Sequence, residues 1–572
     1  MIQENYFTEN QDILLHFNSL IDWNEIVTEY EQDFEEAKEY KKNQNPLYEM
    51  SPSSTEEAQE FYREILNSYG ELSGLEVSQE AGEFDKVGLK FQDGKVTHPK
   101  KMEELVLKFS EAGLIPVTIL RKYGGLGLPH TVKALLTEIL FRADTSFTVA
   151  VSSVNLVSIL QNIATEEQKQ RIIPRVIKEN YSMTMGLSEP NYGSDLPSVT
   201  TKAELVDGKW YLTGTKRFQT MACGINGLPS ATLCLARTGK PGGGARGLSF
   251  FFVESKDYAI AGIEKKMGIK ASATCEVVYE RSPAELLGEE GYGLTRYVMG
   301  MLNGARMSVA CEGVGVSTAA YRECIKYATE RIQFGKPIIQ LPAIRRILDK
   351  MEREIAAMRN LMLEGARSVD MYSWKNLRSN HFESKLKEDE PSKYWNGVSA
   401  VITPLAKYYN AEVANSICYD AIQVFGGAGF CEDYDISSLY RDIRIASIWD
   451  GTSQIQVNAA IGGIVVGIHG TGVFGQYLTK EMSRFRASEQ LLEIYNLVKK
   501  IVSKFKNLSS SEEKEYYSRD VVQCTSRLLN GLLFERQENK VPESFREKRI
   551  KLRKDYNLDS LSELAGINIR LG

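Results

Sequence analysis

Several patterns that define common protein classes are missing from this chain. Its eight cysteines form no Cys-x-x-Cys pair and no regular framework, and its five histidines are scattered. We therefore expect no metal site, no disulfide scaffold and no histidine-based triad, and predict free thiols in a reducing compartment. The first residues are acidic and lack a basic stretch followed by an apolar one. Neither a secretory signal nor an ordinary transit peptide is predicted.

Long apolar runs and an excess of positive charge are also missing. No uninterrupted apolar run of about 18 residues occurs, so we expect no membrane-spanning helix. The formal net charge of −6 argues against generic nucleic-acid binding. With 43% hydrophobic and 25% charged residues, the composition is that of a globular protein, and 572 residues suffice for two to four domains. We expect a cytoplasmic protein.

The periodicity of apolar residues predicts a mainly α fold with a central β domain. Three- and four-residue spacing indicates an N-terminal helical domain over 1–182. Short alternating runs rich in Thr, Val, Tyr and Phe, with Asp207-Gly208 as a hairpin signal, predict a β-barrel-like middle domain over 183–287. Helical spacing then returns, indicating a C-terminal four-helix bundle over 288–470 and an additional helical segment over 471–572.

Two charged stretches interrupt or follow the bundle. Residues 374–397 are polar and are predicted to form a surface loop or insertion. Residues 546–554 hold six cations in nine positions. This run is expected either to be a solvated helix face that pairs with the acidic N-terminal segment of a partner subunit, or to contact an anionic membrane surface or a nucleic acid. Nucleic acid is the less favoured partner, since the last 102 residues are only +5 (19 Lys and Arg against 14 Asp and Glu).

A single carboxylate, Asp450, precedes Gly451 and Thr452 in an otherwise apolar run. A lone carboxylate beside a flexible backbone and a hydroxyl suits a general base that removes a proton from carbon inside a dry pocket. Four further motifs accompany it: Leu187-Ser-Glu-Pro-Asn-Tyr-Gly-Ser-Asp195, Arg331-Ile-Gln-Phe-Gly-Lys336, Gln423-Val-Phe-Gly-Gly-Ala-Gly-Phe430 and Arg441-Asp442. In this order and spacing they resemble the FAD-dependent acyl-CoA dehydrogenase family over roughly residues 100–470, and the chain is most similar to the longer members with extra N- and C-terminal segments.

The resemblance implies that FAD lies between the β domain and the bundle, partly held by a neighbouring subunit. A glycine-bearing turn with free hydroxyl and N–H groups suits a flavin edge, and an arginine fork suits its diphosphate. The implied cofactor contacts are Met185, Leu187, Ser188, Ser194, Phe218, Thr220, Arg331, Phe334, Gln423, Gly426, Gly427, Thr452 and Gln454. Two alternatives stay open: Phe218 as a residue of the β-domain core, and Gly426 as a plain helix C-cap. Pro342 stands where the family often has a diphosphate-contacting glutamine.

The implied reaction is α,β-dehydrogenation of an acyl-CoA thioester. Asp450 would remove the α-proton while the β-hydrogen leaves as hydride, and burial should raise the pKa of Asp450. The implied substrate contacts are Ser194, Asn303, Arg306 and Gly451, with a helix ion pair as the alternative for Arg306. By the same resemblance we expect an electron-transferring flavoprotein as electron acceptor and a homodimer or homotetramer.

The base departs from the family pattern, because most members have Glu where this chain has Asp450. Aspartate reaches roughly 1.5 Å less far. Three interpretations are open: a pocket that brings a branched or cyclic substrate closer, a slow enzyme, or loss of the reaction. Some members place the base on a bundle helix, but the matching residue here is Ala305.

Other functions of the same architecture are alternatives. An acyl-CoA oxidase would let oxygen reach the reduced flavin. A DNA-associated flavoprotein would need a strongly basic C-terminal domain. A non-catalytic acyl-CoA-binding protein is suggested only by the aspartate substitution.

Overall fold

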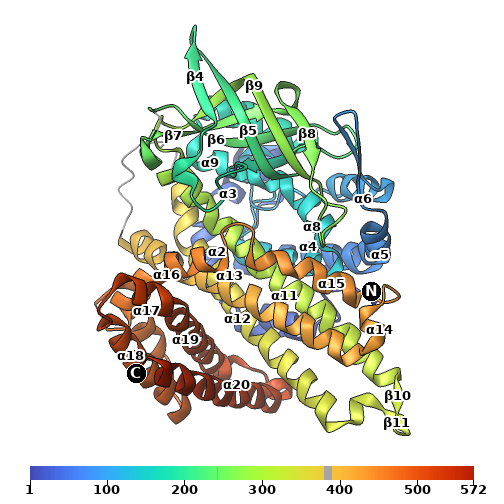
Figure 1. The fold of residues 1–572 in the computed structure, drawn as a ribbon, viewed down its shortest axis with the longest axis vertical. Coiled ribbons are helices and arrows are strands. Elements are labelled where there is room, and N and C mark those ends of the chain that lie inside the picture. Colours follow the sequence, from blue (N-terminus) through green and yellow to red (C-terminus); the bar gives the residue numbers. More distant parts are fainter. Residues whose placement is uncertain (241, 379–389, 470, 572) are drawn as a thin grey trace.

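The computed structural model describes residues 1–240, 242–378, 390–469 and 471–571. A β domain lies at one end, a helical bundle runs beneath it, N-terminal helices flank both, and four C-terminal helices cover one side of the bundle (Figure 1). The predicted fold class, mainly α with a central barrel-like β domain, is confirmed. The domain limits assigned from the sequence stay predictions.

The N-terminal region is helical apart from a short hairpin, β1 (Lys90–Gln92) with β2 (Lys95–Thr97). Several of its helices begin where side-chain oxygens cap the free N–H groups, as Ser54 does for α4 and Thr165, in a capping box with Gln168, does for α10. The helices are α1 Gln11–Leu15, α2 Trp23–Glu31, α3 Glu35–Asn43, α4 Thr55–Leu72, α5 Ser78–Val87, α6 Lys100–Glu111, α7 His130–Ala143, α8 Thr145–Ser152, α9 Leu160–Ile163 and α10 Glu166–Lys178.

One segment within the described ranges, Thr145–Ile163, is long and apolar enough to cross a membrane by length and composition, and 67% of it is buried inside the protein. Our expectation of no such segment rested on uninterrupted apolar runs and is corrected here. The segment is divided among α8, a 3-10 turn over Ser153–Ile159 and α9. Burial of this extent is what the core of a helical domain produces.

The middle domain is a seven-stranded sheet that closes on itself. Its strands are β3 Ser182–Gly186, β4 Lys202–Val206, β5 Lys209–Thr220, β6 Ser230–Arg237, β7 Leu248–Glu254, β8 Ala259–Ile263 and β9 Thr274–Leu287. The order is β3-β6-β4-β5-β9-β7, and β7 also pairs with β6, which completes a ring. Asp207 and Gly208 both have positive φ, as the two-residue turn between β4 and β5 requires. Strands β3 and β8 were not predicted.

The bundle consists of α11 Met299–Glu330, α12 Pro342–Arg378, α13 Glu390–Phe425 and α16 Ser453–Gly467, with short α14 Gly427–Phe430, α15 Ile436–Ile443 and a hairpin of β10 Ile332–Gln333 and β11 Lys336–Pro337. Small residues let α11 approach its neighbours closely. A Cβ on Gly315 would lie 2.5 Å from the Glu138 carbonyl oxygen of α7, and one on Gly313 would lie 2.8 Å from the Asn410 carbonyl oxygen of α13. Helix α11 is therefore packed directly between the N-terminal region and the bundle.

The predicted loop over 374–397 is wrong at both ends. Helix α12 continues to Arg378 and α13 begins at Glu390, while 379–389 lie outside the described residues. Trp374 is buried, and its Nε1 donates to Asp370 Oδ1 at 2.9 Å. Packing of this aromatic ring against Tyr30 extends the helix beyond the point where the polar sequence suggested its end.

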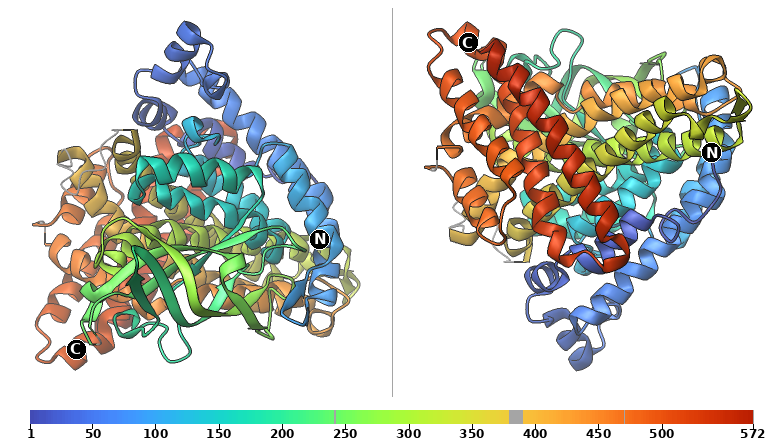
Figure 2. Two further views of the ribbon diagram at one scale, coloured as in Figure 1. Left: turned by 90° about the horizontal axis from the view of Figure 1, so that it is seen from above. Right: turned by 90° about the horizontal axis from the view of Figure 1, so that it is seen from below.

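The C-terminal segment forms α17 Val473–Met482, α18 Glu489–Lys506, α19 Ser511–Gln537 and α20 Glu543–Arg570, and α20 crosses in front of the bundle in the view from below (Figure 2). Buried ion pairs fix it, including Arg536–Glu364 at 2.6 Å. The basic run lies on α20, where buried Arg549 pairs with Asp12 at 3.2 Å and Lys548 pairs with Glu352. Arg549 thus pairs with the N-terminal segment of its own chain, whereas Lys551 and Arg553 pair with Asp349 and Glu535 outside that segment. Pairing of the run with a partner subunit stays a prediction.

Candidate active site

The loop that presents Asp450 is held by its backbone carbonyl groups. Asp450 and Gly451 have φ values of +51° and +86°, a left-handed conformation that Asp tolerates and Gly favours. Lys407 Nζ, from α13, donates to the carbonyl oxygens of Trp449 and Gly451. Gln456 Nε2 donates to the carbonyl oxygens of Gly451 at 2.8 Å and Asp450 at 3.3 Å. Three consecutive carbonyls are thus fixed by two buried side chains.

A chain of hydrogen bonds connects this loop to α11. Buried Arg306 donates through Nε to Gln456 Oε1 at 2.9 Å and through a terminal nitrogen to Asn303 Oδ1 at 2.8 Å. Thr403 Oγ1 of α13 donates to the same Asn303 oxygen at 3.2 Å. Within the described part of the chain the partners of Arg306 are amides, so the helix ion pair considered as its alternative role does not form there. The structure brings Asn303, Arg306 and Gly451 together with the candidate base.

The Asp450 carboxylate itself accepts no hydrogen bond from any residue that the structure describes. Burial raises its pKa, against the nearby positive charge of Lys407, which lowers it. Burial likewise lowers the pKa of Lys407 to about 8, although the charges of Asp450 and Glu312 act in the opposite direction. A carboxylate that is desolvated and not hydrogen-bonded is a stronger base than one in water.

Glu312, on α11, is a second carboxyl group in this region that the sequence analysis missed. It is fully buried, and neither of its oxygens has a hydrogen-bond partner among the described residues. Burial raises its pKa well above the ordinary value, with Asp442 and Asp450 adding to the rise and Lys407 opposing it. A charged residue type inside the apolar run of α11 was the available signal.

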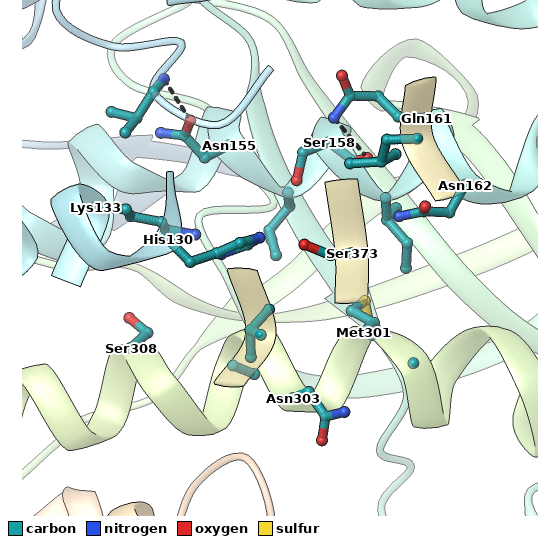
Figure 3. Close-up of a pocket in the computed structure, with 18 of the residues that line it drawn as sticks. His130, Lys133, Asn155, Ser158, Gln161, Asn162, Met301, Asn303, Ser308 and Ser373 are labelled. Atoms are coloured by element: carbon teal, nitrogen blue, oxygen red, sulfur yellow. Dashed lines mark hydrogen bonds between the residues drawn. The ribbon is translucent and has the colours of Figure 1, made fainter. Parts of the chain in front are cut away.

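A cavity of about 620 Å³ lies beside this network, between α7, the segment 151–163, the start of α11 and the end of α12 (Figure 3). Its wall includes Asn303 and Ala305 of α11. Asn303 thus joins the cavity wall to the hydrogen-bond chain that reaches the carbonyls around Asp450. The volume is roughly twenty times the ~30 Å³ share of one water molecule, enough for an acyl chain.

The candidate flavin contacts on the β domain form one group. Arg217 N donates to the Ser188 carbonyl oxygen at 2.9 Å, which places the turn after β3 beside the end of β5. The hydroxyls of Ser188 and Thr220 bond to no described residue, and Phe218 is 56% exposed at φ +60°, so it is not a core residue. Met185 and Leu187 are half-buried and Ser194 is exposed. Unused hydroxyl donors beside an exposed aromatic ring fit a flavin edge.

Glu189, inside the same motif, has a structural role. It accepts from Lys216 Nζ at 3.0 Å, from Thr200 N at 2.8 Å and from Thr201 N at 2.7 Å. Burial acts to raise its pKa, but the Lys216 charge and these hydrogen bonds outweigh burial and lower the pKa to about 2. Lys216 also donates to the Leu187 carbonyl oxygen. This pair fixes the shape of the turn that carries the candidate flavin contacts.

A second group of candidate cofactor contacts lies at the far end of the bundle, away from the β domain (Figure 1). The ends of α11 and α13 meet there through stacked Tyr327 and Phe425, whose ring centroids are 4.2 Å apart. Arg331, Phe334, Gln423, Gly426 and Gly427 are all exposed, and Phe334 is 88% exposed. A Cβ on Gly426 or Gly427 would meet no atom within 4 Å. Gly426 ends α13, as the alternative for it proposed, yet neither glycine is required by packing within the chain.

Thr452 and Gln454 are engaged within the chain. Thr452 caps α16 by accepting from Ile455 N at 3.4 Å, and Gln454 Nε2 donates to Asn458 at 3.0 Å and to Ser518 of α19 at 3.3 Å. Their cofactor contacts stay predictions. Arg441 and Asp442 of the last motif join α15 to other elements, since Arg441 pairs with Asp85 and Asp442 accepts from Ile269 N.

Comparison with known proteins identifies the family. The N-terminal, middle and C-terminal domain models of acyl-CoA dehydrogenases match residues 90–180, 184–282, and 291–376 with 377–463, more than half of the chain. The 3-methylmercaptopropionyl-CoA dehydrogenase of Ruegeria pomeroyi is 30% identical over 425 residues, which are 70% of each chain. The protein therefore belongs to the acyl-CoA dehydrogenase family, a family of FAD-dependent oxidoreductases.

Two further relatives add detail. A Bacillus anthracis acyl-CoA dehydrogenase, solved in complex with FAD, shares the fold with a TM-score of 0.75 at 21% identity and covers 89% of this chain and 88% of its own. Subunit CarC of the caffeyl-CoA reductase-Etf complex of Acetobacterium woodii is 31% identical over 361 residues, 62% of this chain and 87% of that protein. The relatives thus include proteins named for reduction as well as for dehydrogenation.

Proposed function

We propose that this protein catalyses the α,β-dehydrogenation of an acyl-CoA thioester, with Asp450 as the base. The observation that carries the proposal is the fixed loop at 449–451, whose carbonyls are bound while the Asp450 carboxylate is left free. Such a base is aligned before substrate arrives, which lowers the cost of reaching the transition state.

The backbone N–H of Asp450 adds a second function. It donates to no acceptor within the described part of the chain. In the proposed complex it donates to the thioester carbonyl oxygen, where negative charge develops as the α-proton leaves. Asp450 Oδ then receives this proton. FAD, when bound, supplies the acceptor for the hydride that leaves the β-carbon.

The two groups of candidate cofactor contacts support a homodimer or homotetramer. The β-domain group and the far-end group lie at opposite ends of one protomer (Figure 1). The far end also exposes Ile332, Phe334 and Phe430. A neighbour that brought its β domain to this end would cover these apolar side chains, and Arg331 would reach the neighbour's FAD diphosphate.

We further propose an electron-transferring flavoprotein as the redox partner in the cytoplasm, supported by the Etf complex named for one relative. Reduction of a 2-enoyl-CoA is the reverse reaction at the same site. It is a second candidate function, because that relative is named as a caffeyl-CoA reductase subunit. Two assays distinguish dehydrogenation from reduction. One supplies the reduced electron-transferring flavoprotein with 2-enoyl-CoA, and the other supplies the oxidised flavoprotein with acyl-CoA. The faster reaction identifies the favoured direction. Oxygen consumption without partner would instead indicate an oxidase.

The deciding experiment is anaerobic titration of the purified flavoprotein with straight, branched and cyclic acyl-CoAs, watching the visible flavin absorbance. Wild-type protein should bleach with at least one of them. Asp450→Asn should retain FAD but lose bleaching by about 1,000-fold or more in rate, since no base remains. The matched control is Asp433→Asn, an exposed aspartate of the preceding loop. Undiminished reduction in Asp450→Asn would remove Asp450 from its role.

A further inference from the structure

The wall of the cavity beside the candidate base holds several polar side chains. Four serine hydroxyls line it and form no hydrogen bond with any residue in the described ranges: Ser152, Ser158, Ser308 and Ser373. Ser373 Oγ is buried as well as unpartnered. Figure 3 shows Ser158 and Ser373 with His130 around the centre of the cavity. A methyl-terminated chain would leave these groups unsatisfied, at a cost of desolvation for each.

Lys133, on α7, is the charged group of this inner wall. It lines the cavity, and neither a carboxylate nor any other described acceptor pairs with its Nζ. Its neighbours on the wall are His130 of the same helix and Ser308 of α11 (Figure 3). Burial lowers the pKa of Lys133 and, together with the Lys133 charge, lowers that of His130 to about 3, so the imidazole is neutral. An ammonium group inside a protein ordinarily has an anionic partner.

The remaining charges of the cavity do not provide one. Its lining holds Lys122, Lys169 and Arg296 in addition to Lys133, against only two carboxylates, Glu166 and Glu289. Glu166 is engaged with Lys169 and accepts from Tyr123. With Lys133 in its ammonium form, four cations face two anions in the lining, and a bound anion would balance this excess.

We propose that the cavity accepts an acyl group with a carboxylate at its far end, that is, an ω-carboxyacyl-CoA, and that Lys133 binds this carboxylate. The inference rests on the proposed function, because it assigns the acyl chain to this cavity. One carboxylate oxygen accepts from Lys133 Nζ, and hydroxyl donors of the wall serve the other. The carboxylate also restores the ammonium form of Lys133, whose charge burial disfavours in the empty cavity.

The test compares thioesters that differ only at the chain end: butyryl- with succinyl-CoA, pentanoyl- with glutaryl-CoA, and hexanoyl- with adipoyl-CoA. Flavin bleaching by the holoenzyme gives the rate, and calorimetric titration onto the Asp450→Asn holoenzyme gives binding without turnover. In at least one pair the carboxylate should bind about 10- to 100-fold more tightly than the methyl form. Lys133→Met should abolish this preference, while Lys169→Met, which removes a lysine from the same lining, should keep it.

The outcomes separate the two proposals. A carboxylate preference in calorimetry without bleaching by wild-type protein would overturn the proposed reaction and leave the carboxylate site standing. Bleaching with no preference in any pair, or a preference that survives in Lys133→Met, would overturn the carboxylate site and leave the reaction standing. Should Lys133→Met fail to fold, Lys133→Gln serves in its place, and the wild-type comparison of chain ends alone decides.

Discussion

The loop around Asp450 and the far end of the bundle were both predicted as ligand contacts, but they are built differently. At the loop, the carbonyls of 449–451 are all bound by Lys407 and Gln456. At the far end, Arg331, Phe334 and Gly427 are exposed and no packing explains the glycine. The difference teaches that the loop of the candidate base is fixed within one protomer, whereas the residues predicted to contact the nucleotide at the far end are exposed.

The largest effect is expected from Lys407→Met. Loss of the ammonium group frees two buried carbonyls and lets the base shift, so kcat should fall about 100-fold with KM changed little. Stability should fall by about 2 kcal/mol. Lys350→Met, which removes an exposed pair with Asp420 at 2.9 Å, should cost under about 1 kcal/mol and leave kcat unchanged. A wild-type kcat in Lys407→Met would mean that Gln456 holds the loop alone.

At the far end of the bundle, a substitution should change the affinity for FAD. Arg331→Ala should weaken FAD binding by about 10- to 100-fold, because a charged hydrogen bond to phosphate is lost, and should leave the free enzyme's melting temperature unchanged. Titration of apoprotein with FAD measures the first quantity. Arg570→Ala on α20 is the control, since its partner is Asp520 on the neighbouring helix. Equal FAD affinity in both variants would remove Arg331 from the cofactor site.

The smallest effect concerns Glu312, beneath the loop. Its pKa is raised in the folded protein, so the stability it confers is present at low pH and is lost as pH rises from the unfolded value of 4.5 toward the folded one. The Gln side chain of Glu312→Gln does not titrate, so the variant does not lose this stability as the pH rises. The difference in melting temperature between variant and wild type should therefore grow between pH 5 and 9, reaching on the order of 1–3 °C. A pH-independent difference would show that Glu312 does not titrate differently on folding.

The fold was largely predictable because long elements have clear periodicity. Helix α13 was expected only after the predicted loop over 374–397 but begins at Glu390, because polar residues at its start hid about two more turns. Strand β3 was not predicted, because its five residues, Ser182–Gly186, are nearly all buried and show no alternation of apolar and polar side chains. A short buried strand is determined by its pairing with neighbouring strands rather than by its local sequence.

The candidate site was predictable only where a motif marks it. Asp450 was found from its sequence setting, whereas Lys407, Glu312 and Lys133 were not. Their roles depend on which distant groups they meet, since Lys407 is 42 and 44 residues from the carbonyls it binds. A signal did exist, because each is a charged residue within an apolar stretch of its helix. A charged side chain in an apolar stretch needs an interaction partner, and only the tertiary structure shows which group that is.

The ion pair between Asp12 and Arg549 joins groups 537 residues apart in the chain. At about 5–20 residues per second, the ribosome needs roughly 30 to 100 s to make the intervening stretch. During that time Asp12 lacks its partner Arg549, although Arg359 is synthesised earlier and also pairs with Asp12. Helix α20 can dock only after residues 543–570 have been made, and a chain stopped before Glu543 would lack the Asp12–Arg549 ion pair.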